Sequence, residues 1–402
     1  MPMTPQECLS RMCELWRQAV DADRVRRTQR RHAAAFAFAE TDYVPLRFGA
    51  AVTDLNDWPE YDWAEQFHDP VKSLYMQMRG LLGFVRSGCD QLPSVRPDMG
   101  VVNCMSVMGA GYVVPEHTKP VVNAYVPKEQ LAAFEVPEDI SGLGTLPRVR
   151  EHMEHHLSAL AEKGLGGLVH VHHCDQQGPF DIAAQARGHE IFIDLYEDPD
   201  FVHGLMRKST EVYVAVSKFC KSINGEPLNA GSACGFWMEN GGLRMCADSD
   251  VLISPELWEQ FVLPYQIQAF EPFGGGWVHY CGGVEGFKRP EGLHLHDLMA
   301  RNPYVRALNW TTAHDWLAEM AKLFELGIAH QGGLPRRKDE DLESYFRRVF
   351  SAYPRPTGLL FDARSVAPEE EPVAMDVWHR VQDDLYGEPG SPRRAALAGA
   401  GG

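Results

Sequence analysis

Short apolar runs alternate with longer segments of helical period along the whole chain, and this alternation constrains the fold more than any other feature. The runs that read as strands cover residues 34–38 or 43–48, 101–105, 168–172, 227–230, 277–280, 305–310, 328–331 and 358–361. Strands that alternate with helices form a parallel sheet, and eight of them close into a barrel. The pattern therefore predicts a (β/α)8 TIM barrel.

Segments of helical period outside these runs divide the chain into three parts. A helix over 5–31 and a second over 63–85 read as an N-terminal helical extension of residues 1–95. Residues 96–386 are predicted to form the barrel. Residues 387–402 are rich in glycine, alanine and proline without an apolar period, so we expect a disordered tail.

Composition limits the partners and the compartment. A formal net charge of −17 argues against nucleic acid or an anionic membrane as partner, because phosphates would be repelled. The nine cysteines are an odd number without the spacing of a disulfide scaffold, and no apolar run is long enough to span a bilayer. We therefore expect a cytoplasmic protein, and assembly as a homodimer is left open. The one basic stretch, residues 24–31, reads as a solvated helix face, with a docking patch as the alternative.

The strongest local signal is a short strand bounded by glycines, Gly274-Gly275-Gly276-Trp277-Val278-His279-Tyr280-Cys281-Gly282-Gly283. Residues two apart on a strand point to the same face, so His279 and Cys281 would project together into the barrel. Barrel enzymes place their chemistry at the carboxyl ends of their strands. Because zinc favours nitrogen and sulfur donors, the pair is a candidate metal site, although buried histidine and cysteine without function are common.

Further motifs accompany this strand in a characteristic order. Upstream are Gly178-Pro179-Phe180, Asp194-Leu195-Tyr196-Glu197-Asp198-Pro199 and Leu252-Ile253-Ser254-Pro255-Glu256-Leu257-Trp258, and downstream is Arg306-Ala307-Leu308-Asn309-Trp310. With the His-x-Cys-Gly strand, this order resembles the methyltransferase branch of the uroporphyrinogen decarboxylase superfamily over roughly residues 100–385.

The resemblance implies a zinc-dependent methyltransferase. It would move a methyl group between a small-molecule donor, of the methyl ether or methylamine type, and a corrinoid (cobalamin) protein or a thiol. Zinc would bind His279 and Cys281. In the coenzyme M methyltransferases of this branch a second cysteine follows the last strand, but residues 361–365 here contain none. Candidates for the third ligand are Cys234, Glu239, Cys246 and Asp248, and we prefer Glu239.

Four other residues are candidates for the catalytic pocket. Asp248 precedes the helix at Ser254 and could act as a general base or orient a ligand histidine. Arg47, Asn309 and His330 stand at predicted strand ends and are expected to line the pocket.

Two alternatives to the methyltransferase remain open. The first is a metal-free decarboxylase or lyase of the uroporphyrinogen decarboxylase type, and the second is a non-catalytic binding protein on the same fold. The porphyrinogen decarboxylases hold substrate carboxylates with an N-terminal Met-Arg-Gln-Ala-Gly-Arg stretch, whereas the region around Arg47 has one arginine. Because several substrate carboxylates need several fixed cations, haem-pathway decarboxylation is disfavoured.

Two histidine clusters compete with the main motif. His172, His173 and Asp175 end a predicted strand and are expected near the pocket, although core histidines are more common than ligands. The cluster at residues 151–156 lacks the His-Glu-x-x-His order of a zinc protease and reads as a solvated helix face.

Overall fold

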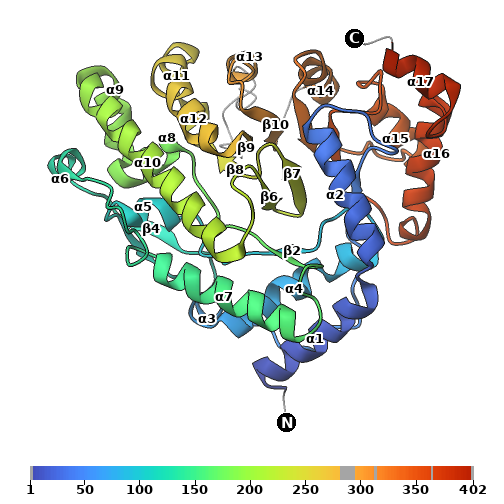
Figure 1. Cartoon of the computed structure of the whole chain (residues 1–402), viewed down its shortest axis with the longest axis horizontal. Helices are drawn as coiled ribbons and strands as arrows, with labels where there is room; N and C mark the ends of the chain where they lie inside the picture. Colours follow the sequence, from blue (N-terminus) through green and yellow to red (C-terminus); the bar gives the residue numbers. More distant parts are fainter. Residues whose placement is uncertain (1–2, 281–294, 312–314, 364, 400–402) are drawn as a thin grey trace.

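The strands β6 (Ala230–Ala233) to β10 (Val305–Trp310) lie at the centre of a ring of helices (Figure 1). The computed structural model describes residues 3–280, 295–311, 315–363 and 365–399. Within them, one sheet contains six parallel strands in the order β1-β12-β11-β10-β9-β8. Their bounds are Leu46–Arg47 (β1), Leu359–Asp362 (β12), Ala329–Gly332 (β11), Val305–Trp310 (β10), Gly276–Tyr280 (β9) and Arg244–Cys246 (β8).

Two further parallel strands, β2 (Ser94–Val95) and β5 (His170–Val171), complete the ring. An isolated parallel bridge joins Gln177 to Cys246, so the segment after β5 runs beside β8. On the other side, the backbone N–H of Asp90 donates to the carbonyl of Leu46 at 2.8 Å, which links the approach to β2 with β1. The eight strands thus form the predicted (β/α)8 barrel.

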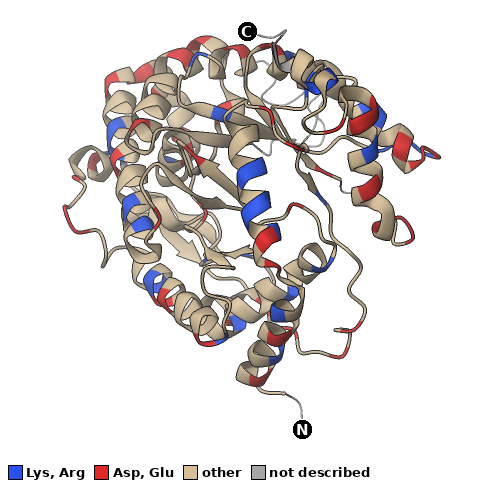
Figure 2. Ribbon diagram, turned by 45° about the vertical axis from the view of Figure 1, so that its right-hand side comes forward, with Lys and Arg blue, Asp and Glu red and all other residues tan. Residues whose placement is uncertain are grey.

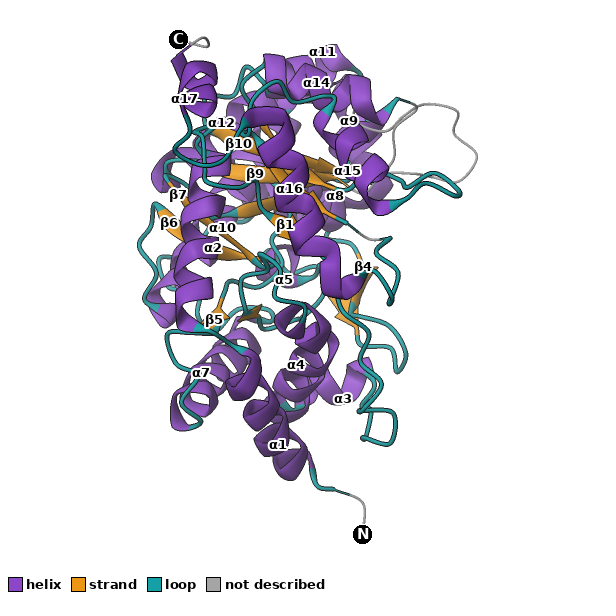
Figure 3. Cartoon of the chain, turned by 90° about the vertical axis from the view of Figure 1, so that its right-hand side faces the viewer, coloured by secondary structure: helices purple, strands orange, loops and turns teal. Residues whose placement is uncertain are grey.

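Helices cover the outside of the barrel, and the N-terminal helices α1, α3 and α4 group with α7 on one side (Figure 3). The helices of the first half are α1 (Pro5–Ala19), α2 (Ala22–Phe36), α3 (Trp63–His68), α4 (Pro70–Arg86), α5 (Asn103–Val107), α6 (Lys128–Ala133), α7 (Leu146–Glu162), α8 (Pro179–Arg187), α9 (Ile191–Glu197) and α10 (Pro199–Asn224). Those of the second half are α11 (Pro255–Phe261), α12 (Leu263–Phe270), α13 (His296–Met299), α14 (Trp316–Glu325), α15 (Leu342–Phe350), α16 (Ala374–Tyr386) and α17 (Pro392–Gly399).

Two predicted helix starts are confirmed, because their capping residues form the expected hydrogen bonds. The side chains of Asp198 and Ser254 accept hydrogen bonds from the first turns of α10 and α11, each with proline at the first helical position. The long helix expected over 5–31 is two helices instead, because Asp21 caps a second start at Ala22.

A β-hairpin fills the N-terminal end of the barrel. Its strands β6 (Ala230–Ala233) and β7 (Phe236–Glu239) are antiparallel, and Figure 1 shows them at the centre of the ring. Hairpin side chains pack with early residues of the barrel strands and with the end of α2 in one apolar cluster: Ala35, Phe36, Ala233, Phe236, Met238, Trp277, Ala307, Ala329 and Leu360. The polar residues further along the same strands are therefore left at the carboxyl end of the interior. A second hairpin, β3 (Gly111–Val113) and β4 (Val121–Ala124), lies outside the sheet.

Several expected elements differ from the structure. Residues 34–38 belong mostly to the end of α2, residues 101–105 overlap α5, and residues 227–230 reach only the first residue of the hairpin strand β6. The barrel strands at these stages are the short β2 and β8. Since β1 and β2 lie within residues 1–95, that segment supplies two barrel strands as well as helices.

The C-terminal tail expected to be disordered contains α17. Arg394 on this helix is buried and donates hydrogen bonds to the carbonyls of Thr41 and Gly387, at 2.9 and 3.2 Å. The contact with Thr41 attaches the tail to the N-terminal part of the chain.

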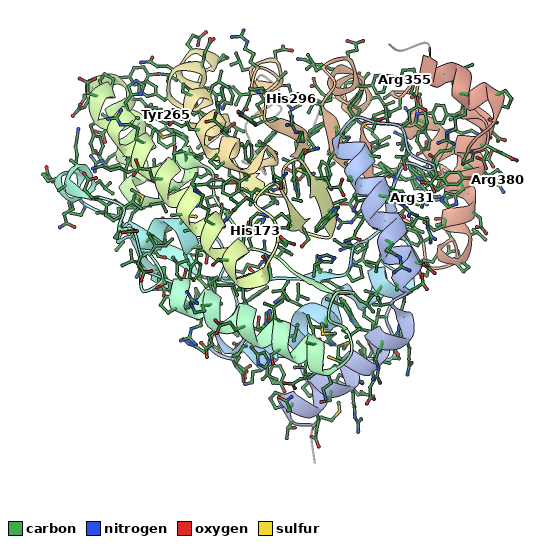
Figure 4. The ribbon with its side chains drawn as sticks, in the orientation of Figure 1. Arg31, His173, Tyr265, His296, Arg355 and Arg380 are labelled. Atoms are coloured by element: carbon green, nitrogen blue, oxygen red, sulfur yellow. The ribbon has the colours of Figure 1, made fainter. Side chains whose placement is uncertain are left out.

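Two segments expected to be solvated are in part buried. The basic residues of the stretch 24–31 follow α2 (Figure 2), but Arg31 (labelled in Figure 4) is 4% exposed and forms ion pairs with Asp42 and Asp90, at 2.7 and 3.0 Å. On α7, His152 and His156 are fully buried because they lie one turn apart on its inner face. Within the described residues, no helix has both the length and the apolar character needed to cross a bilayer.

Candidate active site

A continuous chain of polar contacts crosses the barrel interior from β9 to β1. His279 Nδ1 and Asn309 Oδ1 are hydrogen bonded, and Asn309 Nδ2 donates to the carbonyl of Gln331. The side chain of Gln331 in turn donates to Asp362 at 3.3 Å, and Asp362 pairs with Arg47 Nε at 3.2 Å. Five successive strands, β9, β10, β11, β12 and β1, each contribute one of these residues. We call this set, His279, Asn309, Gln331, Asp362 and Arg47, the interior polar chain.

These contacts fix the tautomer of His279. Asn309 uses its Nδ2 donor on the backbone carbonyl of Gln331, so its amide oxygen faces the histidine. An amide oxygen only accepts, so Nδ1 of His279 carries a proton, and in the neutral ring Nε2 carries the lone pair. This is the arrangement in which ligand histidines are usually held, with one ring nitrogen bonded to a protein oxygen and the other directed to a metal or a substrate.

Arg47 connects the interior polar chain to the tip of the hairpin. Its Nη1 donates to the carbonyl of Cys234 at 3.1 Å, and its guanidinium lies 4.3 Å from the centre of the Phe236 ring. The tip residue Cys234 has a positive φ of 48°, followed by Gly235 at 84°, which is the backbone that a two-residue hairpin turn requires. The turn thus supports the arginine from below.

A second group of charged residues lies on the β2, β5 and β8 side. Arg244 Nη1 lies 2.7 Å from Asp175, and Arg96 pairs with both Asp175 and Asp98, at 3.4 and 3.3 Å. Lys119 pairs with Asp98 at 2.7 Å. We call these five residues the cation-rich cluster. The neighbouring guanidinium groups hold the pKa of the Asp175 carboxyl below its usual range although burial opposes this.

Backbone contacts position the cation-rich cluster. The main chain of Arg96 is held in both directions by the side chain of Gln77 on α4, at 2.9 and 2.7 Å. The carbonyl of Asp175 accepts from Asn103 at 3.0 Å, and the guanidinium of Arg244 lies 5.5 Å from the Trp277 ring centre. These groups are therefore fixed before any ligand arrives.

Most charged side chains of the two groups are not completely buried. Arg47, Arg96, Arg244, Asp175 and Asp362 keep between 12 and 16% of their side-chain surface exposed. At the carboxyl ends of β10 to β12 a cavity of about 200 Å3 is lined in part by Trp310, Trp316, Leu334, Pro335 and Asp362.

Asp248 lies beyond the carboxyl end of β8, next to a second carboxylate. Its backbone N–H donates to Asp181 at 2.8 Å, and that of Ser249 donates to the same carboxylate at 2.5 Å. Burial, and secondarily the charge of Asp248, raise the pKa of Asp181 to about 7. The pair can therefore hold a proton near neutral pH.

Cys246 occupies the interior position beside His279. The two residues are partners in the register of β8 and β9, and Sγ of Cys246 accepts from Arg244 Nη1 at 2.9 Å. Burial raises the pKa of this thiol, so it stays protonated in the absence of a ligand. Among the residues considered for a third zinc ligand, Cys246 is the one that the register places beside His279.

Glu239 lies at the other end of the barrel. It ends β7 beside Asn240, Gly274 and Arg306, which line a separate cavity of about 450 Å3 at the start of the strands. His279 is at least three strand residues further along β9, a distance of about 10 Å. The structure therefore does not bring Glu239 to His279, and Glu239 is not the third ligand in this arrangement.

His330 also lies outside the interior. It is fully buried and stacks on Trp310 at 4.3 Å between ring centres, while its neighbour Gln331 faces the interior. Burial lowers the pKa of His330 to about 3, so it is neutral. The expectation that it lines the pocket is corrected by the alternation of β11, which turns His330 to the helix layer.

Tyr280 and His296 form a contact on the outer side of β9. The tyrosine hydroxyl is hydrogen bonded to Nε2 of His296, and Nδ1 of that histidine lies 2.9 Å from Glu319 on α14. Figure 4 labels His296 near α13, away from His173 beside α10. This relay holds the strand that carries His279 against the helices.

The His172 to Asp175 segment divides between the interior and the core. Nε2 of His172 accepts from the backbone N–H of Cys234 at the hairpin tip, at 3.3 Å, and Asp175 belongs to the cation-rich cluster. His173 is 3% exposed and its Nδ1 hydrogen bonds the carbonyl of Cys174, so it belongs to the core.

Cys281 lies outside the described residues. Within the described part, no three His, Cys, Asp or Glu side chains are grouped so that they could hold a metal ion.

Sequence reasoning missed Gln331, Asp362, Arg96, Arg244 and Asp181. The first two could have been found from the alternation of their strands, and Asp181 directly follows the quoted Gly-Pro-Phe motif. The region around Arg47 supplies one arginine, and Arg96 and Arg244 from other segments join it in the barrel.

Comparisons with known proteins agree on the fold. The family model described as uroporphyrinogen decarboxylase (URO-D) matches residues 95–300. Among solved structures, a "methyltransferase from Methanosarcina mazei" superposes with a TM-score of 0.61 at 15% sequence identity, over 88% of this chain and 98% of that chain. A search of curated proteins found no match.

Proposed function

Because the chain belongs to the uroporphyrinogen decarboxylase family, we propose that it is a methyltransferase on the (β/α)8 barrel of that family. It would move a methyl group between a small-molecule donor, of the methyl ether or methylamine type, and a corrinoid protein or a thiol. The observation that carries the proposal is the fixed tautomer of His279, whose Nε2 lone pair belongs to an interior polar group at the carboxyl end of β9. The solved methyltransferase with the same fold supports it at the level of the fold.

The proposal includes a zinc ion at His279. The donor set fits in part: the Nδ1 contact to Asn309 prepares Nε2 as a ligand, and Cys246 lies beside it in register. Cys281 is assigned from the sequence alone, and Cys246 takes the place first given to Glu239. When bound, zinc supplies a Lewis acid that activates a methyl donor or stabilises a thiolate.

The chain's own residues would orient the reactants and supply a proton. Removing a methyl group from an ether leaves an oxygen anion, which becomes a neutral alcohol when it takes up one proton. Asp181 holds a proton near neutral pH and hydrogen bonds the backbone of Asp248, which lies beyond the end of β8. We assign proton donation to this pair, with Asp248 as the member nearer to solvent.

The test is a methyl-transfer assay with metal analysis. Purified protein is mixed with reduced corrinoid protein and a panel of methyl ethers and methylamines, and cobalt methylation is followed by absorbance. We expect methylation by at least one donor, about one zinc per chain, and loss of both in His279→Ala. A panel without any cobalt methylation, or active protein without metal, contradicts the proposal.

A metal-free decarboxylase or lyase is the second candidate, and one observation favours it. Arg47, Arg96 and Arg244 all reach the interior, so the fixed cations that substrate carboxylates need are present after all. Release of carbon dioxide from a carboxylate substrate by zinc-free protein would support this function instead.

A further inference from the structure

The cation-rich cluster carries more positive than negative charge. Lys119, Arg96 and Arg244 are paired with two carboxylates, Asp98 and Asp175, in an alternating chain that begins and ends on a cation. Arg47, across the interior, is already matched by Asp362. Lys119 is the outer end of this chain, with 40% of its side chain exposed, so water screens its charge, and Arg96 and Arg244 share the carboxylate of Asp175 between them.

Arg96 and Arg244 also have guanidinium N–H groups that none of the described carboxylates accepts. Among the described residues, Arg96 makes its ion pairs through Nη2 and Arg244 makes its contacts through Nη1. Nη1 of Arg96 and Nη2 of Arg244 thus retain protons that no described carboxylate accepts. Because Asp175 lies between the two guanidinium groups and contacts both, they are held as neighbours.

The guanidinium of Arg244 lies close to the proposed reaction centre. Its Nη1 is 2.9 Å from Sγ of Cys246, which is the register partner of His279 on the next strand. Neighbouring strands are about 4.8 Å apart. A small molecule bound to the arginines would therefore present its other end to His279.

We propose that Arg96 and Arg244 together bind a carboxylate group, so that the substrate of this barrel is a small carboxylic acid. A carboxylate accepts two parallel N–H bonds from guanidinium groups, and Nη1 of Arg96 and Nη2 of Arg244 have the protons to supply them. A phosphate dianion would place two charges next to Asp175 and Asp98. The inference rests on the proposed function for the reaction, where it specifies a methyl donor that carries a carboxylate, but the binding itself does not depend on methyl transfer.

The experiment compares carboxylates with their amides. Binding of acetate, methoxyacetate, benzoate and 4-methoxybenzoate, each beside its neutral amide, is measured by calorimetry, with inorganic phosphate as a non-carboxylate anion. We expect at least one carboxylate to bind 10-fold or more tightly than its amide and than phosphate. The preference is lost in Arg96→Gln and Arg244→Gln.

Two further variants keep the test independent of folding. Arg96→Lys retains the charge beside Asp175 but not the planar fork, and we expect it to fold and to bind the carboxylate several-fold more weakly. Arg348→Gln removes an equally enclosed arginine, 13% exposed and paired with Glu340 outside the barrel interior, and should bind like the wild type.

The outcomes separate this inference from the proposed function. No carboxylate preference anywhere in the series, or equal preference in wild type, Arg96→Gln and Arg244→Gln, overturns carboxylate recognition. Methylation of cobalt from uncharged donors, undiminished in Arg96→Gln, also overturns it while the methyltransferase stands. Carboxylate binding that depends on both arginines, without transfer from any donor, supports the inference and counts against the methyltransferase.

Discussion

His279 on β9 and Asn309 on β10 are joined through Nδ1 and the amide oxygen, and the same asparagine is tied to β11 through the carbonyl of Gln331. The histidine is thus oriented by two neighbouring strands rather than by its own. A ring held in this way presents one defined nitrogen to the interior.

Asn309→Ala removes the oxygen that fixes this ring. Loss of the hydrogen bond to the second ring nitrogen of a metal-binding histidine typically lowers metal affinity or activity by about 10- to 100-fold. We expect a loss of that size in zinc affinity and in turnover. Competition with a chelator measures the zinc affinity. Asn309→Asp keeps an acceptor for Nδ1 and should lose less. Wild-type zinc affinity in Asn309→Ala would show that the contact is not used for metal binding.

Asp181 is expected to stay protonated up to about pH 7. Its pKa of about 7 is raised above the ordinary 3.8, so between pH 4 and pH 7 the folded chain keeps a proton that the unfolded chain has lost. The contribution of this group to the free energy of unfolding therefore falls as pH rises through that interval. The infrared band of protonated carboxyl groups should persist to about pH 7 and be diminished in Asp181→Asn. Exposed Asp139, whose pKa is lowered by Ser141, is the control, and Asp139→Asn should leave the band unchanged.

Acid should destabilise the fold through its buried neutral histidines. Burial lowers the pKa of His152 to about 3, against the ordinary 6.5, so below pH 6.5 the unfolded chain binds a proton that the folded chain excludes. At pH 5 this costs about 2 kcal/mol. We expect His152→Leu to recover about that much unfolding free energy at pH 5 relative to pH 8, as measured by urea denaturation. His117→Leu, at a site where the side chain is 81% exposed, should show no such gain. Parallel pH curves for wild type and His152→Leu would refute the assignment.

The turn of the interior hairpin should tolerate no side chain at Gly235. A Cβ there would lie 1.9 Å from the side chain of Gln91, and φ is +84°. Gly235→Ala is expected to lower the free energy of unfolding by about 2 to 3 kcal/mol, from backbone strain and displacement of Gln91. Gly225 ends α10 with φ +75° and open space around it. Gly225→Ala should therefore lower the free energy of unfolding by the backbone strain alone, about 1 kcal/mol. An equal decrease in the free energy of unfolding in the two variants would mean that displacing the Gln91 side chain costs no free energy.

The sequence predicts much of the barrel because most of its strands are apolar runs bounded by helices. Strands β9 to β12 lie where those runs predict them, and alternation alone turns His279 to the interior. The short strands β2 and β8 contain two and three residues, so they carry no periodic signal. Arg96 and Arg244 stand on or next to these strands. In sequence they look like surface residues, and only closure of the barrel places them inside.

The site was harder to predict where the chain reverses. Glu239 follows the interior strand after the Cys234-Gly235 turn, and the reversal carries it to the opposite end of the barrel from His279. His330 and Gln331 are neighbours on β11, and their side chains point to opposite faces of the sheet. Which of them points into the barrel depends on how β11 pairs with β10 and β12. Neither fact is local, so neither could be read from composition or spacing.

The hairpin of β6 and β7 also determines from which end of the barrel reactants reach His279. Among the described residues, Phe236 and its neighbours fill the barrel from the N-terminal end, so we expect a reactant to approach His279 from the carboxyl end. In the proposed methyl transfer, donor, product and acceptor would then enter and leave at the same end of the barrel. When two of them are too large to occupy it together they must take turns, which is the kinetic signature of an enzyme that releases its first product before its second substrate arrives.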